Sequence, residues 1–165
     1  MDIDITKTCC FTGHRPDKLL GSEEHIREAL KERIEDAISN GTDAFISGMA
    51  EGVDIWAAEE VLKLKAGGED IKLVCAVPFN GVERKRTAMQ QETFCSILSE
   101  ADDIVYVCQK YTPWCFSARN RWMVDHSSKA IAVFNGTSGG TEKTLDYAGH
   151  CGLEIVMIKD EEGDT

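Results

Sequence analysis

The sequence predicts an α/β fold: a doubly wound, mostly parallel Rossmann-like sheet of about six strands flanked by helices. Apolar runs alternate with helical patterns along the chain. Most runs are continuously apolar, as in residues 73–77 and 130–134, which is typical of parallel strands covered on both faces. Three glycine-bearing turns, at 12–16, 47–54 and 135–141, each follow such a run and lead toward a helix.

Each element is predicted from its own local pattern. The first helix begins after Ser22, a suitable N-cap, and ends at Asn40-Gly41. Gly67-Gly68 ends the second helix. In chain order, we expect strands at 8–12, 43–47, 71–77, 103–108, 129–134 and 154–158, and helices at 23–39, 52–66, 81–100, 114–127 and 140–150.

The composition favours a single globular domain. The chain has 165 residues, of which 42% are apolar and 28% charged. We expect one Rossmann-like domain over residues 1–158 and a frayed acidic tail over 159–165. The first residues are acidic and lack a long apolar stretch, so we expect no signal peptide, no membrane span and no membrane partner.

Seven cysteines are scattered along the chain without a Cys-x-x-Cys pair. The odd number, with Cys9, Cys10, Cys75 and Cys108 in or beside apolar runs, is typical of free thiols in a reducing cytoplasm, where we expect the protein to reside. The four histidines do not pair at helical spacing. We therefore expect no metal and no required cofactor.

The charge balance is acidic, with a net charge of −11 and a pI near 4.8. Nucleic-acid binders usually carry a basic face, so this balance disfavours nucleic acid as a partner. The one dense basic segment is Arg84-Lys85-Arg86. It is interpreted either as a local anion-binding patch or as a solvated helical turn.

The first glycine-bearing turn places Gly13, His14 and Arg15 just beyond the first strand. Ligands of open α/β sheets bind outside the carboxyl ends of the strands. Glycine permits close approach of a ligand, arginine can hold a phosphate or carboxylate in a bidentate contact, and histidine can donate a hydrogen bond or act as an acid or base. The alternative is a surface turn with a solvated arginine.

The second turn contributes Ser47, Gly48, Glu51, Gly52 and Asp54. Its spacing matches neither the dinucleotide fingerprint nor the Walker signature. The serine and backbone N–H groups are suited to a phosphate, and the two carboxylates to ribose hydroxyls or polar head groups. Alternatively, the aspartate only interacts with the positive end of the following helix.

The third turn contributes Gly136, Thr137, Gly139, Gly140 and Thr141. This glycine- and hydroxyl-rich pattern is typical of a phosphate cradle at a helix N-terminus, with a mobile surface loop as the alternative.

Upstream of the third turn, Arg119 and Asn120 follow the aromatic segment 111–114. An aromatic side chain beside an arginine can hold a base or sugar. Trp114 and Phe116 are equally suited to the core.

Together these segments resemble the SLOG superfamily of nucleotide-sensing Rossmannoids, and most closely its small bacterial YpsA-like branch. The matching pieces cover nearly the whole chain in order: 12–16, 47–54 with 56–59, 119–125, and 139–141 before 147–148. The resemblance implies a Rossmann-like fold and a nucleotide-derived ligand.

Two further families are more distantly similar. The turn at 47–54 resembles that of the DNA-processing protein A family, which binds single-stranded DNA. The stretch 119–141 is similar to the cytokinin-activating phosphoribohydrolases, a lysine-decarboxylase-like family that uses an arginine and a glutamate to cleave a base from a nucleoside monophosphate. The arginine falls on Arg119, whereas Lys143 and Thr144 stand nearest the glutamate position.

Three functions follow as hypotheses. The first is a sensor that binds a phosphate-bearing small molecule, such as a mononucleotide or ADP-ribose, and acts on a regulatory protein partner. The second is a nucleotide hydrolase in which Arg119 orients the phosphate and Glu51 or Asp54 is the acid–base carboxylate. The third is a single-stranded nucleic-acid-binding module. A homodimer is the oligomeric state we consider, because homodimers are common among soluble oligomers.

Overall fold

Strands and helices alternate along the described part of the chain, residues 3–160 of a computed structural model. No helix in this range is both long enough and apolar enough to cross a membrane. The strands are β1 (Thr8–Gly13), β2 (Ala44–Ser47), β3 (Lys72–Phe79), β4 (Asp103–Cys108), β5 (Lys129–Phe134) and β6 (Glu154–Lys159). The helices are α1 (Glu23–Ser39), α2 (Val53–Ala66), α3 (Ala88–Glu100), α4 (Cys115–Asp125) and α5 (Gly140–His150), with short 3₁₀ helices η1 (Ile5–Lys7), η2 (Pro16–Lys18) and η3 (Val82–Lys85).

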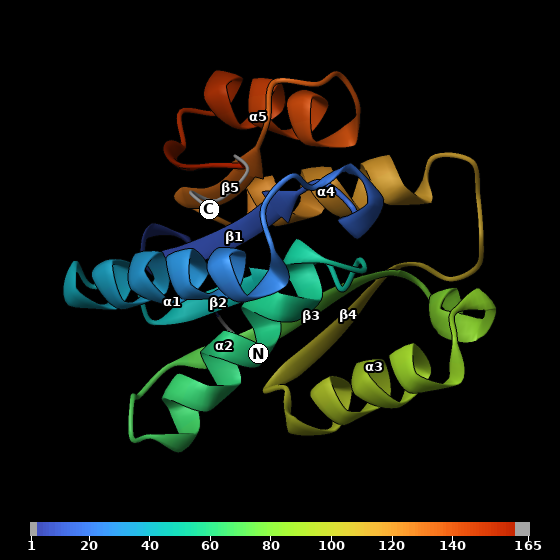
Figure 1. Cartoon of the computed structure of the whole chain (residues 1–165), viewed down its shortest axis with the longest axis horizontal. Coiled ribbons are helices and arrows are strands. Elements are labelled where there is room, and N and C mark those ends of the chain that lie inside the picture. Colours follow the sequence, from blue (N-terminus) through green and yellow to red (C-terminus); the bar gives the residue numbers. More distant parts are fainter. Residues whose placement is uncertain (1–2, 161–165) are drawn as a thin grey trace.

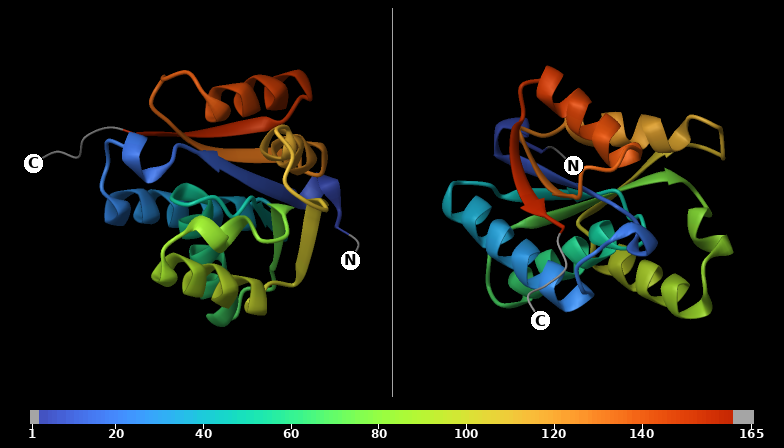
Figure 2. Two further views of the ribbon diagram at one scale, coloured as in Figure 1. Left: turned by 90° about the vertical axis from the view of Figure 1, so that its right-hand side faces the viewer. Right: turned by 45° about the horizontal axis from the view of Figure 1, so that its top comes forward.

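The six strands form one parallel sheet in the order β4-β3-β2-β1-β5-β6. Helices α1, α2 and α3 cover one face of it, and α4 and α5 cover the other (Figures 1 and 2). The chain adds β2, β3 and β4 on one side of β1 and then returns to add β5 and β6 on the other. The predicted doubly wound α/β fold is confirmed, and its switch point lies between β1 and β5.

Alternate residues of the central strands face opposite helical layers. Phe11 and Phe45 stack with ring centroids 5.9 Å apart in the core beneath α1, α2 and α3. Cys10 and Ile46 face the other way and pack near Met123 of α4. This two-sided burial explains why the strands are continuously apolar.

All seven cysteines are free thiols, as their number and spacing predicted. Burial raises the pKa of Cys10 and of Cys75 to about 12, so both side chains are neutral and act as small apolar groups in the sheet.

Helix ends follow local capping rules, and one of them corrects the sequence prediction. Ser22 caps α1 as expected, accepting a hydrogen bond from the backbone N–H of His25 at 3.2 Å. The single helix expected over 81–100 is instead divided into η3 and α3. Thr87 caps α3 in a reciprocal capping box with Gln90, and this pair begins a new helix there.

The sequence prediction placed the start of the acidic tail, residue 159, too early in the chain. Strand β6 runs to Lys159, and Asp160 is buried. The Asp160 carboxylate accepts hydrogen bonds from the backbone N–H groups of Leu20 and Gly21, both at 2.8 Å. Lys159 and Asp160 therefore belong to the fold. The remainder of the predicted tail, 161–165, lies outside the described residues.

Candidate functional site

The turns after β1, β2 and β5 meet at one edge of the sheet. Strand β1 pairs with both β2 and β5, and Gly13 at its end is level with Val133 of β5. A hollow of about 240 Å³, here called the smaller hollow, lies at this edge. The sequence candidates on its wall are Gly13, His14, Arg15, Asp54, Arg119, Asn120, Gly139, Gly140 and Thr141.

A second hollow of about 770 Å³, the larger hollow, adjoins the first. The two share Arg15, Ala50, Phe116 and Arg119 on their walls. Of the two aromatic residues left open by the sequence, Phe116 therefore faces both hollows, whereas Trp114 is 63% exposed and lines neither. The rest of the larger hollow is lined by Glu51, Phe79, Asn80, Gly81, Val82, Arg84, Lys85, Arg86 and Tyr111.

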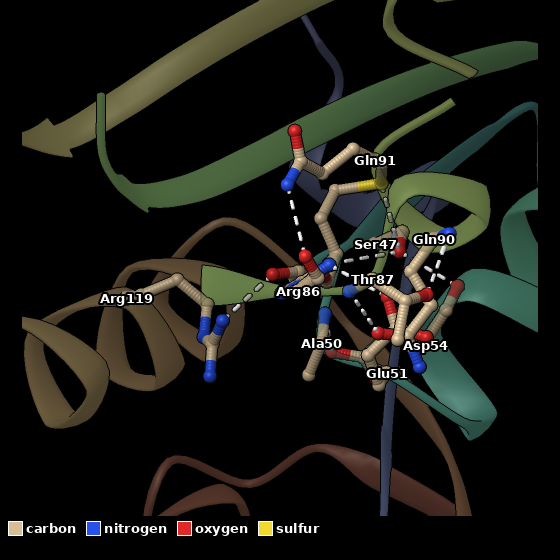
Figure 3. Close-up of polar contacts among 11 residues, drawn as sticks. Ser47, Ala50, Glu51, Asp54, Arg86, Thr87, Gln90, Gln91 and Arg119 are labelled. Atoms are coloured by element: carbon tan, nitrogen blue, oxygen red, sulfur yellow. Dashed lines mark hydrogen bonds and ion pairs between the residues drawn. The ribbon is translucent and has the colours of Figure 1, made fainter. Parts of the chain in front are cut away.

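The turn between β2 and α2 is held by its own side chains (Figure 3). The Ser47 hydroxyl donates to the carbonyl oxygen of Asp54 at 2.8 Å and accepts from the N–H of Met49 at 3.2 Å. The Asp54 carboxylate accepts from the N–H of Ala50 at 3.3 Å. Met49 is fully buried in a left-handed conformation with φ of 60°. Ser47 thus shapes the turn, and it lines neither hollow.

Two arginines from distant segments hold the same turn. Arg119 donates from Nη1 to the carbonyl oxygen of Gly48 at 2.6 Å. Arg86 donates to the carbonyl oxygen of Met49 and to the Glu51 carboxylate, each at 2.9 Å. Arg86 is not among the site residues that the sequence predicts. The basic segment 84–86 was the available signal, but its proximity to the turn arises only from the fold.

Arg119 is a buried cation on the wall that the two hollows share. It is 7% exposed, donates from Nε to Asn120 at 2.8 Å, and lies 5.8 Å from the ring centroid of Phe116. Burial lowers the pKa of Arg119 and raises that of Asp54, and the opposite charge of each partner opposes the shift. The Nη2 atom of Arg119 donates no hydrogen bond to any residue within 3–160. The guanidinium therefore retains donors for an anion.

His14 links the turns after β1 and β5. Its Nε2 accepts a hydrogen bond from the N–H of Asn135 at 3.3 Å, and its ring stacks on Phe134 at 5.5 Å. Burial lowers the pKa of His14, which favours the neutral ring that this contact requires. The contact places the proton on Nδ1.

Besides Ser47, four more of the sequence candidates line neither hollow. Gly48 lies beneath the site, where an added Cβ would be 2.8 Å from the Asp54 carboxylate. Gly52 precedes α2 with φ of 92°. Gly136 and Thr137 form a separate turn in which the Thr137 hydroxyl donates to the Asn135 side chain at 2.7 Å. These residues shape the loops around the hollows.

The described residues place few carboxylates at the site. Thr144, near the position of the phosphoribohydrolase glutamate, is buried and donates its hydroxyl to the carbonyl of Gly140 at 2.8 Å, while Lys143 is exposed. Glu51 and Asp54 are the carboxylates on the two hollow walls. Within residues 3–160, no group of three or more His, Cys, Asp or Glu side chains could hold a metal ion.

Solved structures of DNA-processing proteins share this fold. The chain aligns with DNA processing protein A from Helicobacter pylori with a TM-score of 0.63 and 17% identity, covering 92% of this chain and 65% of that one. The alignment with DNA processing protein A from Streptococcus pneumoniae has a TM-score of 0.50 and 13% identity, covering 95% and 59%. The chain therefore spans about two thirds or less of either protein.

One of these structures corrects an expectation drawn from charge. The acidic composition led to the expectation that nucleic acid is an unlikely partner, and that expectation is wrong. The H. pylori structure is described for the single-stranded DNA binding mode of a protein with this fold.

Sequence relatives agree with the motif resemblance. UPF0398 proteins from Bacillus thuringiensis (strain Al Hakam) and Bacillus cereus (strain AH187) are each 28% identical over 147 residues, covering 84% of this chain and 80% of theirs. A model of the YspA SLOG family matches residues 9–151. The predicted kinship is confirmed, and the chain belongs to the YspA SLOG family.

Proposed function

We propose that this protein binds the phosphate group of a nucleotide or nucleotide-derived small molecule in the smaller hollow, and that a regulatory protein partner responds to its occupancy. The observation that carries this proposal is the buried Arg119 guanidinium, whose Nη2 has no hydrogen-bond partner within residues 3–160. Because a buried cation with unused donors favours a nearby anion, a phosphate is the ligand group that fits it best.

The start of α5, which lines the same hollow, supports the same ligand. No side chain caps this helix of 11 residues, and Gly140 and Thr141 of its first turn line the smaller hollow. Their N–H groups and the positive end of the helix dipole favour an anion. Arg15 also lines this hollow, is exposed, and forms no ion pair with another residue of the described range.

Single-stranded nucleic acid is the second candidate ligand. The larger hollow combines aromatic side chains with Arg84, Lys85 and Arg86, a combination that suits bases and a phosphate backbone. The shared fold with DNA processing protein A from H. pylori, whose structure is described for single-stranded DNA binding, supports this candidate as well.

Glycosidic cleavage is not part of the proposal. The Glu51 carboxylate is paired with Arg86 at 2.9 Å, and Asp54 is buried against its own turn. An acid–base carboxylate must reach the bond that it acts on, and both groups are engaged in holding the turn.

The test is titration calorimetry with AMP, ADP-ribose and adenosine on the wild type and on Arg15→Gln. We expect AMP or ADP-ribose to bind, adenosine to bind at least about tenfold more weakly, and Arg15→Gln to weaken the phosphate-bearing ligand about tenfold, since it removes a charged hydrogen-bond donor. Arg33→Gln on α1 is the control of equal charge. Equal affinity for adenosine and AMP would refute the proposal.

A further inference from the structure

The smaller hollow is too small for a whole nucleotide. Its volume is about 240 Å³, whereas ligand sites usually measure about 300–1,000 Å³. The larger hollow, at about 770 Å³, shares Arg15, Phe116 and Arg119 with it. A nucleotide whose phosphate lies in the smaller hollow therefore has its remaining volume available in the larger one.

Three aromatic rings form one wall of the larger hollow. Phe79, at the end of β3, meets Tyr111 edge-on at 5.6 Å and Phe116 of α4 edge-on at 6.3 Å. Tyr111 is 61% exposed although it belongs to this cluster. An exposed aromatic ring on a supported cluster is a suitable stacking platform for a base.

Positive charge lines the rest of this hollow. Arg84 and Lys85 are exposed, and neither forms an ion pair with any residue between 3 and 160. The one carboxylate on its wall, Glu51, is already paired with Arg86. In a chain of net charge −11, this local excess of cations favours a second anionic group on the ligand.

We propose that the larger hollow is a second subsite, which takes the base of the ligand on Tyr111 and a second phosphate at Arg84 and Lys85. This inference rests on the proposed function, because the first phosphate lies at Arg119. The ligand is a nucleoside that carries two separate phosphate groups, one for each hollow. It is supplied either by a small bisphosphate or dinucleotide, or by one unit of a single-stranded nucleic acid.

The test compares AMP, adenosine 3′,5′-bisphosphate and a short oligodeoxyadenylate in calorimetric titrations. The bisphosphate should bind the wild type about tenfold more tightly than AMP. Arg84→Gln/Lys85→Gln should abolish this advantage, weakening the bisphosphate about tenfold more than it weakens AMP. Tyr111→Ala should weaken both ligands at least about fivefold. Lys31→Gln/Arg33→Gln on α1 is the charge-matched control, and thermal melts verify folding of these surface variants.

The oligonucleotide distinguishes the two sources. Tighter, salt-sensitive binding of the strand than of the bisphosphate indicates single-stranded nucleic acid, and no gain indicates a small molecule. The inference is overturned if the bisphosphate gains nothing over AMP and the Arg84, Lys85 and Tyr111 variants bind as the wild type does. If Arg15→Gln still weakens AMP in that case, the proposed function stands alone. If no nucleotide binds, the second subsite and the proposed function are both refuted.

Discussion

Two glycines at the same edge of the sheet are there for different physical reasons. An added Cβ on Gly13 would lie 2.5 Å from Cγ2 of Val53, the buried first residue of α2. An added Cβ on Gly140 has nothing within 4 Å. Gly13 is therefore required by packing between β1 and α2, and Gly140 leaves space at the hollow.

This difference predicts opposite outcomes for two alanine substitutions. Gly13→Ala should lower the free energy of unfolding by about 1–3 kcal/mol, because the first turn of α2 has to shift. Gly140→Ala should leave stability unchanged or raise it by up to about 1 kcal/mol, because alanine is the better helix former. Urea denaturation measures both. A stable Gly13→Ala protein would show that the contact with Val53 relaxes at little cost.

The buried His14 predicts a dependence of stability on pH. Burial lowers the pKa of His14 below its ordinary value, so the unfolded chain takes up this proton first as the pH falls. The free energy of unfolding should therefore decrease below about pH 6.5 until the folded pKa is reached.

In urea denaturation at several pH values, His14→Gln should lose this part of the slope. An identical slope in wild type and variant would contradict the assignment.

At the scale of elements, the sequence predicted most of the secondary structure and misplaced one helix. Helices over 23–39 and 140–150 and strands over 103–108 and 129–134 have the predicted bounds, because caps and apolar runs determine them locally. The helix expected over 81–100 was wrong, since its N-terminal part is η3. The capping box of Thr87 and Gln90 is a local signal for the start of a helix. It lies inside a longer stretch of helical pattern, and that pattern led to the prediction of one continuous helix.

The capping box at Thr87 gives a prediction for α3. Thr87→Ala removes the hydroxyl that accepts from the N–H of Gln90 at 3.2 Å and should cost about 1 kcal/mol of stability. Ser96→Ala, an exposed position within the same helix, is the control and should change stability little. Equal denaturation midpoints for the two variants would show that this cap contributes nothing.

At the scale of the whole molecule, the sheet edge that holds the site was predictable from the sequence, and the larger hollow was not. Glycine-bearing turns after parallel strands indicate one edge of the sheet, and the structure places nine of the candidates on one hollow there. The larger hollow combines Phe79, the segment 84–86 and Tyr111, which only the tertiary arrangement brings together. Net charge averages over the surface, which is why it misled the inference about nucleic acid.

The central place of β1 in the sheet has a consequence for biosynthesis. Residues 8–13 can pair with β2 once 44–47 has been made, but their other edge has no strand until 129–134 has been made. Because the smaller hollow is lined by residues from both ends of this interval, a nascent chain cannot form it until the segment 139–141 has been made. Ligand binding would thus require every segment from β1 to the start of α5, and a fragment that stops before β5 would expose an unpaired strand edge to aggregation.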